Sequence, residues 1–222
     1  MGKTIIMQAR GHGSKTYQVR ARAFVYPARY LCDLEGEYEV IKLVNSSGFT
    51  APLAKLKGKN GIFFDFAANG IYEGQKIRFG GNNDGDIARL GDLPTTTKVF
   101  NIELRNKDGG KLVRTSGNSA VILNKTDNTV TLMLPSKQEK VFDSNCRATV
   151  GVIAGQGRLD KPILKAGKMH YIKKTKSKLW PRTSAVKMNA IDHPFGSGRG
   201  KRIKSKIAKR NAPAGARVGL IR

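Results

Sequence analysis

The chain has 222 residues, 39% of them hydrophobic, and its 41 lysines and arginines against 16 acidic residues give a formal net charge of +25. It has no apolar run near the ~20 residues that a membrane span needs and no apolar signal-peptide core, which argues against a membrane or secreted protein. The charge is uneven: residues 1–29 carry +6, residues 30–154 carry +2, and residues 155–222 carry +17. A nearly neutral middle can fold, whereas basic ends need dense negative charge, so this distribution predicts a nucleic-acid binder.

The first third of the chain is predicted to form a small β-barrel. Residues 1–29 are a basic N-terminal extension whose end can already supply the first strand. Short β-prone runs separated by turn residues follow at 38–45, 50–57, 61–67 and 75–79. Together with the extended stretch before them they make about five strands, which predicts a barrel over residues 30–80. The Gly- and Asn-rich residues 81–86 are predicted to be a poorly packed linker.

A second set of β-prone runs predicts another antiparallel barrel over residues 87–154. The runs are 98–104, 119–124, 129–134, 139–143 and 147–153. From Gly155 onward no period of 2 or 3.6 persists, so residues 155–222 are predicted to be an irregular basic extension, disordered when free. Single apolar residues among its basic ones suit an extension that threads a folded RNA. Residues 201–210 could form a helical turn or two on binding, or serve as a nuclear import signal.

Cys32 and Cys146 are isolated in the sequence, with no paired spacing. They are predicted to be ordinary buried, reduced thiols rather than a disulfide or a zinc site. No metal or cofactor is expected, apart from Mg²⁺ or K⁺ ions that a bound RNA would hold.

The densest motif is MNAIDHPFGSG at residues 188–198. Pro194 restrains His193 to an extended conformation, and the glycines allow the backbone to approach another surface closely. A histidine beside Asp192 is compatible with general-base chemistry, but no nucleophile elbow, phosphate-binding loop or metal-ligand set accompanies it. A loop histidine that stacks or hydrogen-bonds is therefore the favoured interpretation.

This motif resembles the most characteristic loop of large-subunit ribosomal protein two, the universal "L two" family. The resemblance also takes in residues 109–123, 147–168, 179–182 and 211–221, in the expected order. Trp180-Pro181-Arg182 and the short N-terminus are similar to the archaeal and eukaryotic branch. Ala190 and Ser197 depart from the residues usual in the family's loop, whereas His193 is retained.

The resemblance implies an all-β fold, in which an OB-fold barrel is followed by an SH3-like barrel with long basic extensions. It implies a structural role in the large ribosomal subunit, with ribosomal RNA and neighbouring ribosomal proteins as partners, in the cytoplasm after any nucleolar assembly. The residues expected to bind RNA are Lys3, Arg10, His12, Lys15, Arg20, Arg22, Lys111, Arg114, Arg158, Lys161, Lys165, Lys168, Lys173, Lys174, Trp180, Arg182, Asn189, His193, Phe195, Arg199, Lys201, Arg202, Lys204, Arg210 and Arg217. The loop expected near the peptidyl-transferase region contains Met188, Asn189, Asp192, His193, Pro194 and Gly196.

Two other functions stay open at this point. One is a free RNA-binding translation or assembly factor built on the same barrels. The other is direct acid–base participation in peptidyl transfer by His193 and Asp192, although the family resemblance makes the RNA the catalyst. We expect neither enzyme activity of the protein itself nor a homo-oligomer.

Overall fold

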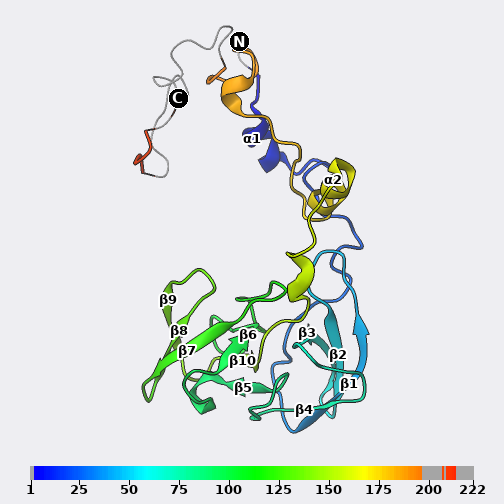
Figure 1. The fold of residues 1–222 in the computed structure, drawn as a ribbon, viewed down its shortest axis with the longest axis vertical. Coiled ribbons are helices and arrows are strands. Elements are labelled where there is room, and N and C mark those ends of the chain that lie inside the picture. The colour runs from blue at the N-terminus through cyan, green and yellow to red at the C-terminus, as the bar shows by residue number, and fades with distance from the viewer. Residues whose placement is uncertain (1–2, 197–206, 208, 214–222) are drawn as a thin grey trace. The chain divides into compact units, whose positions relative to one another are not determined.

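A computed structural model describes residues 3–196, 207 and 209–213 (Figure 1). The chain divides into two compact units, one of residues 21–163 and one of residues 1–20 together with 164–222. We call them the barrel unit and the basic unit.

The first sheet of the barrel unit has four antiparallel strands in the order β3-β2-β1-β4 (Figure 1). The strands are β1 (Glu37–Val44), β2 (Leu53–Gly58), β3 (Gly61–Phe66) and β4 (Lys76–Arg78). They match the four predicted runs to within a few residues, because alternating burial along β1 places Tyr38 and Val40 in the core. Ala28 and Arg29 form bridges with Phe64 of β3, so the end of the predicted extension does pair with this sheet.

The second sheet has six antiparallel strands in the order β5-β10-β6-β7-β8-β9. The strands are β5 (Ile87–Arg89), β6 (Lys98–Phe100), β7 (Ala120–Lys125), β8 (Thr129–Met133), β9 (Glu139–Asp143) and β10 (Arg147–Val150). Strand β5 lies directly after the Gly- and Asn-rich segment 81–86 and was not predicted. Strand β6 is shorter than its predicted run because Asn101 takes a left-handed conformation (φ 45°) and ends the ladder.

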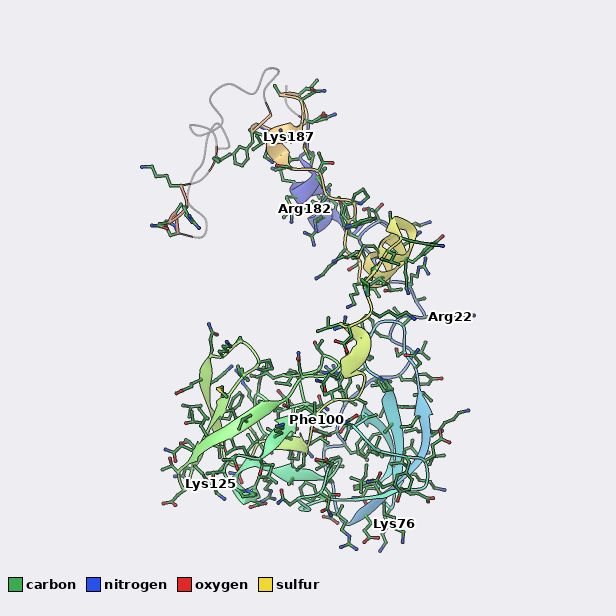
Figure 2. All side chains as sticks on the ribbon, in the orientation of Figure 1. Arg22, Lys76, Phe100, Lys125, Arg182 and Lys187 are labelled. Atoms are coloured by element: carbon green, nitrogen blue, oxygen red, sulfur yellow. The ribbon has the colours of Figure 1, made fainter. Side chains whose placement is uncertain are left out.

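The predicted all-β class with two small barrels is confirmed. Each sheet encloses its own buried cluster, and a third cluster joins the sheets through Leu53, Phe66, Phe100 and Ile153. Figure 2 shows Phe100 between the two sheets. The domain limits 30–80 and 87–154 stay predictions. In the structure, residues 21–163 form one compact unit that contains both sheets.

The segment predicted to be a poorly packed linker is ordered. The Asp86 carboxylate is buried and accepts hydrogen bonds from the backbone N–H groups of Arg78 (2.8 Å) and Asn83 (2.9 Å). The Gly85 N–H donates to the carbonyl of Val150 in β10 (2.9 Å). The prediction of loose packing was therefore wrong, because the turn residues are held by a buried side chain that composition alone does not show.

A buried polar network also joins the two sheets. The Asp65 carboxylate of β3 accepts hydrogen bonds from the Phe66 N–H (2.7 Å), the Asn101 side-chain amide (2.7 Å) and the Thr149 hydroxyl of β10 (2.6 Å). The Thr149 hydroxyl in turn shares a 2.6 Å hydrogen bond with the Tyr30 hydroxyl. Burial raises the pKa of Asp65 to about 6, against the lowering effect of these three hydrogen bonds and of the Arg114 charge.

A second buried contact fixes the chain before β1. Arg147 of β10 binds Glu103 in a bidentate ion pair, Nη2–Oε1 2.6 Å and Nε–Oε2 3.0 Å, with both side chains almost fully buried. Its Nη1 donates to the carbonyls of Leu31 (2.7 Å) and Cys32 (3.0 Å). A single guanidinium therefore links the segment that leads into the first sheet to strand β10 of the second sheet.

Among the described residues, buried hydrophobic side chains lie only between Ala23 and Ile153, so the basic unit has little apolar core. It still contains the helices α1 (Ile6–Ala9) and α2 (Ala166–Thr175). The predicted irregularity from residue 155 onward was wrong over α2. Lys173 and Lys174 lie in the last turn of this helix, where their positive charges interact favourably with the negative end of the helix dipole. Short 3₁₀ turns lie at Arg10–His12, Leu90–Asp92, Gln156–Arg158 and Ala185–Lys187.

Both cysteines are free thiols, as predicted. Cys146 is buried, and burial raises its pKa to about 11. Cys32 is exposed, so the prediction that it is buried was wrong.

Candidate nucleic-acid interface

Residues 188–196 form a closed turn within the basic unit. The N–H groups of Asp192 and His193 donate to the Asn189 carbonyl (3.0 and 3.3 Å), and the Gly196 N–H donates to the His193 carbonyl (2.8 Å). A Cβ at Gly196 would overlap the backbone of Met188 and Asn189. Glycine is therefore required for the turn to close.

The two titratable side chains of this turn point to different partners. Asp192 pairs with Lys3 at 2.5 Å. The His193 Nδ1 accepts a hydrogen bond from the Phe195 N–H (3.0 Å), and the two rings lie 4.8 Å apart between centroids. Because Nδ1 is an acceptor, the proton of the neutral imidazole is on Nε2, which makes that nitrogen a hydrogen-bond donor.

The N-terminal basic side chains are all exposed. Arg10 and Arg20 lie over the rings of Tyr17 (6.0 Å) and Tyr171 (5.8 Å). The others of this group are Lys3, His12, Lys15 and Arg22.

A cleft of about 750 Å³ lies in the basic unit, lined by residues from both ends of the chain. Met7 and Arg10 come from the N-terminus, and Trp180, Arg182 and His193 come from the C-terminal extension. Figure 2 marks Arg182 on this extension. Its guanidinium donates to the Met7 sulfur (3.8 Å), as does that of Arg10 (3.9 Å).

Two other kinds of feature, a metal-binding cluster and a membrane-spanning helix, are absent from the described residues. The described part of the chain contains no group of three His, Cys, Asp or Glu side chains that could hold a metal ion. No described helix is long and apolar enough to cross a membrane.

Comparison with known proteins identifies the family. A family model described as "Ribosomal Proteins L2, C-terminal domain" matches residues 83–215. The chain is 42% identical to the large ribosomal subunit protein uL2 of Hyperthermus butylicus, over all of this chain and 96% of that protein. Proteins of the same name from Archaeoglobus fulgidus and Korarchaeum cryptofilum are 39% and 38% identical, over all of this chain and 96% and 94% of theirs.

The chain belongs to the ribosomal protein L2 family. The resemblance drawn from the loop at residues 188–198 is thereby confirmed, and these three relatives are archaeal.

In this L2-family chain, four of the predicted RNA-binding residues lie in the barrel unit, two in the second barrel and two just after it, and their surroundings differ. Lys111 and Lys161 are exposed. Arg158 is exposed and donates to the Ser116 hydroxyl (2.8 Å). Arg114 is half-buried: its Nη2 donates to the Ala28 carbonyl (2.7 Å), and its guanidinium lies 4.9 Å from the Phe66 ring centroid. Arg114 therefore has a structural role inside the barrel unit, and RNA binding by it stays a prediction.

Helix α2 and the segment after it carry the next group. Lys165, Lys168 and Lys174 are exposed, whereas Lys173, Trp180 and Phe195 are half-buried. Arg210 is exposed. Arg199, Lys201, Arg202, Lys204 and Arg217 lie outside the described residues, as do Ser197 and most of the predicted helical turn at 201–210.

Sequence reasoning missed some residues of the cleft. Met7, Lys178 and Tyr171 were not predicted, yet Met7 and Lys178 line the cleft and Tyr171 carries the Arg20 contact. Tyr171 lies in the same lysine-rich stretch as Lys173, and aromatic residues among basic ones are a signal for RNA stacking that could have indicated it.

Proposed function

We propose that the chain is a structural component of the large ribosomal subunit that binds and organises its ribosomal RNA near the peptidyl-transferase region. In this role it supports subunit assembly, tRNA placement and translation. Its partners are the large-subunit RNA and neighbouring ribosomal proteins, in the cytoplasmic ribosome. Family membership and the names of the relatives support this proposal.

One observation carries the RNA-binding role: the basic unit lacks internal counter-charge. It holds 21 lysines and arginines but a single acidic side chain, Asp192, which Lys3 already engages. The barrel unit holds 20 basic and 15 acidic side chains. A segment with such an excess of like charge and little apolar core gains most from a polyphosphate backbone.

The geometry at His193 favours a positioning role over an acid–base role. A catalytic histidine is commonly oriented by a carboxylate, whereas Asp192 binds Lys3 and the Nδ1 of His193 accepts from the Phe195 backbone. We therefore propose that the RNA, not the protein, catalyses peptidyl transfer. The chain then needs no cofactor of its own, and Mg²⁺ or K⁺ at the interface would be bound by RNA phosphates.

The proposal is tested by the salt dependence of binding to large-subunit RNA. Each phosphate contact contributes a log–log slope of roughly −0.7 to −0.9. We expect the full chain to show a much steeper slope than a fragment of residues 21–163, which keeps the compact barrel unit intact. Equal slopes would mean that the basic unit does not supply most phosphate contacts.

A second measurement separates a ribosomal component from a free factor. The full chain should stay with the large subunit through a high-salt wash, and a chain lacking residues 164–222 should not assemble. Release of the full chain by the wash would favour the free-factor alternative.

A further inference from the structure

The cleft of the basic unit brings together two kinds of side chain that RNA ligands require. Its lining includes the aromatic Trp180 and three cations, Arg10 from the N-terminus and Lys173 and Arg182 from the C-terminal extension. Arg10 is far from the other two in sequence, so only the fold brings it to the same cleft.

The two arginines converge on a single neutral atom. Arg10 and Arg182 donate to the same Met7 sulfur at 3.9 and 3.8 Å. A thioether is a weak acceptor and cancels no charge. The only acidic side chain of this unit, Asp192, is paired with Lys3. The cleft therefore holds two guanidinium groups whose charge no carboxylate of the unit balances.

A phosphate fits these two groups. Their donor nitrogens are separated by no more than the sum of the two distances to the sulfur. A phosphate group that makes charge-assisted hydrogen bonds of about 2.8 Å can contact both guanidinium groups over such a span. Arginine also binds phosphate oxygens in a bidentate manner, which gives the contact a defined orientation.

The aromatic residue that lines the cleft fits a base. Trp180 is the only tryptophan of the chain, it is half-buried, and it lines the cleft beside the arginines. Unpaired bases stack on such rings, whereas bases inside a duplex cannot reach them. The His193 Nε2–H at the same cleft is a donor that can contact an acceptor on the edge of a base.

We propose that this cleft binds one unpaired nucleotide of RNA, with its base on Trp180 and its phosphate between Arg10 and Arg182. The inference rests on the proposed function, because the RNA of the subunit supplies the nucleotide. Basic extensions attract RNA phosphates in general. The proposal adds a defined pocket that holds one unpaired nucleotide.

The deciding experiment is base-specific chemical probing of the RNA in large subunits assembled with variant protein. The test variant is Arg10→Ala/Arg182→Ala, with Trp180→Ala as a second variant. The matched control is Lys187→Ala/Lys209→Ala, which removes the same charge from exposed sites of the basic unit that neither line the cleft nor belong to the predicted RNA-binding residues. We expect both cleft variants to raise the reactivity of the same one or two nucleotides at least tenfold, while the control leaves them protected.

Either of two results in this experiment overturns the inference. One is unchanged reactivity in the cleft variants, and the other is an equal change in the control. Assembly of the wild-type subunit and its retention through a high-salt wash are scored separately. Loss of the wild-type protein there contradicts the proposed function, whereas unchanged reactivity in well-assembled variants contradicts the nucleotide pocket alone.

Fluorescence of the single tryptophan identifies the class of ligand. Full-length protein is titrated at constant salt with a single-stranded pentanucleotide RNA, with the same RNA as a duplex, with inorganic phosphate and with a polyglutamate peptide. We expect the single-stranded RNA to bind at least tenfold more tightly than the others, and the cleft arginine variant to lose this preference. Stronger quenching by polyglutamate would assign the cleft to an acidic protein segment and contradict the RNA proposal.

Discussion

Replacement of Asp65 with asparagine tests how a buried carboxylate changes the free energy of unfolding of the barrel unit. Asp65 is 2% exposed and lies between the two sheets. Desolvation raises its pKa from 3.8 to about 6, so the folded protein binds this proton more tightly than the unfolded chain does. The contribution of Asp65 to stability is therefore greatest below pH 3.8 and falls as the pH rises to about 6, above which the loss is complete.

The size of the effect follows from the two pKa values. The difference between 3.8 and about 6 corresponds to a loss of about 3 kcal/mol in the free energy of unfolding at neutral pH. Asparagine keeps the shape and stays neutral. Its carbonyl oxygen can accept from Phe66 and Asn101, and its amide can donate to the Thr149 hydroxyl, which then turns toward Tyr30.

The assay is urea unfolding of the full chain, followed by far-ultraviolet circular dichroism between pH 4 and 7.5. We expect Asp65→Asn to be as stable as wild type near pH 4 and more stable by up to about 3 kcal/mol at pH 7.5. Asp127→Asn, at an exposed site, is the control and should leave the pH dependence unchanged. A variant that is less stable than wild type at pH 7.5, with an unaltered pH slope, would refute the reasoning and show that the ionised carboxylate is net stabilising.

Three further predictions concern single residues. Arg147→Met leaves the charge of the buried Glu103 carboxylate without its arginine partner, and urea unfolding should show a loss of about 3–5 kcal/mol. Glu103→Gln in the same chain should restore part of this loss, because it removes the charge and keeps an acceptor for the backbone N–H groups of Gly109 and Arg147. A loss below about 1 kcal/mol would contradict the buried pair. Gly110→Ala puts a Cβ 2.6 Å from the Asn101 carbonyl oxygen at φ +83°, so its melting temperature should fall further than that of Gly36→Ala, which has similar φ and open space. His193→Gln should impair assembly or tRNA placement but keep single-turnover peptide-bond formation within about tenfold of normal, whereas a proton-transfer role would cost about 10²–10⁴.

The sequence by itself determined most of the segments that become strands, with β5 as the exception. Alternation along Glu37–Val44 and Thr129–Met133 and the turn residues between runs depend on neighbours a few positions apart, so they can be read locally. The charge division between a nearly neutral middle and basic ends is likewise a property of composition. The MNAIDHPFGSG motif, together with the matching segments at 109–123, 147–168, 179–182 and 211–221, indicated the family, since several matches in one order rarely occur by chance.

Only the tertiary structure decided how polar side chains far apart in sequence combine. Nothing near Asp65 indicates that Asn101 and Thr149 will satisfy its carboxylate, and nothing near Arg114 indicates that it turns inward to the Ala28 carbonyl. The cleft has the same origin, because Arg10 and Arg182 are joined through Met7 by the return of the chain and not by any local pattern. Burial and long-range pairing set the energy of a charged group, and both depend on which distant segments pack together.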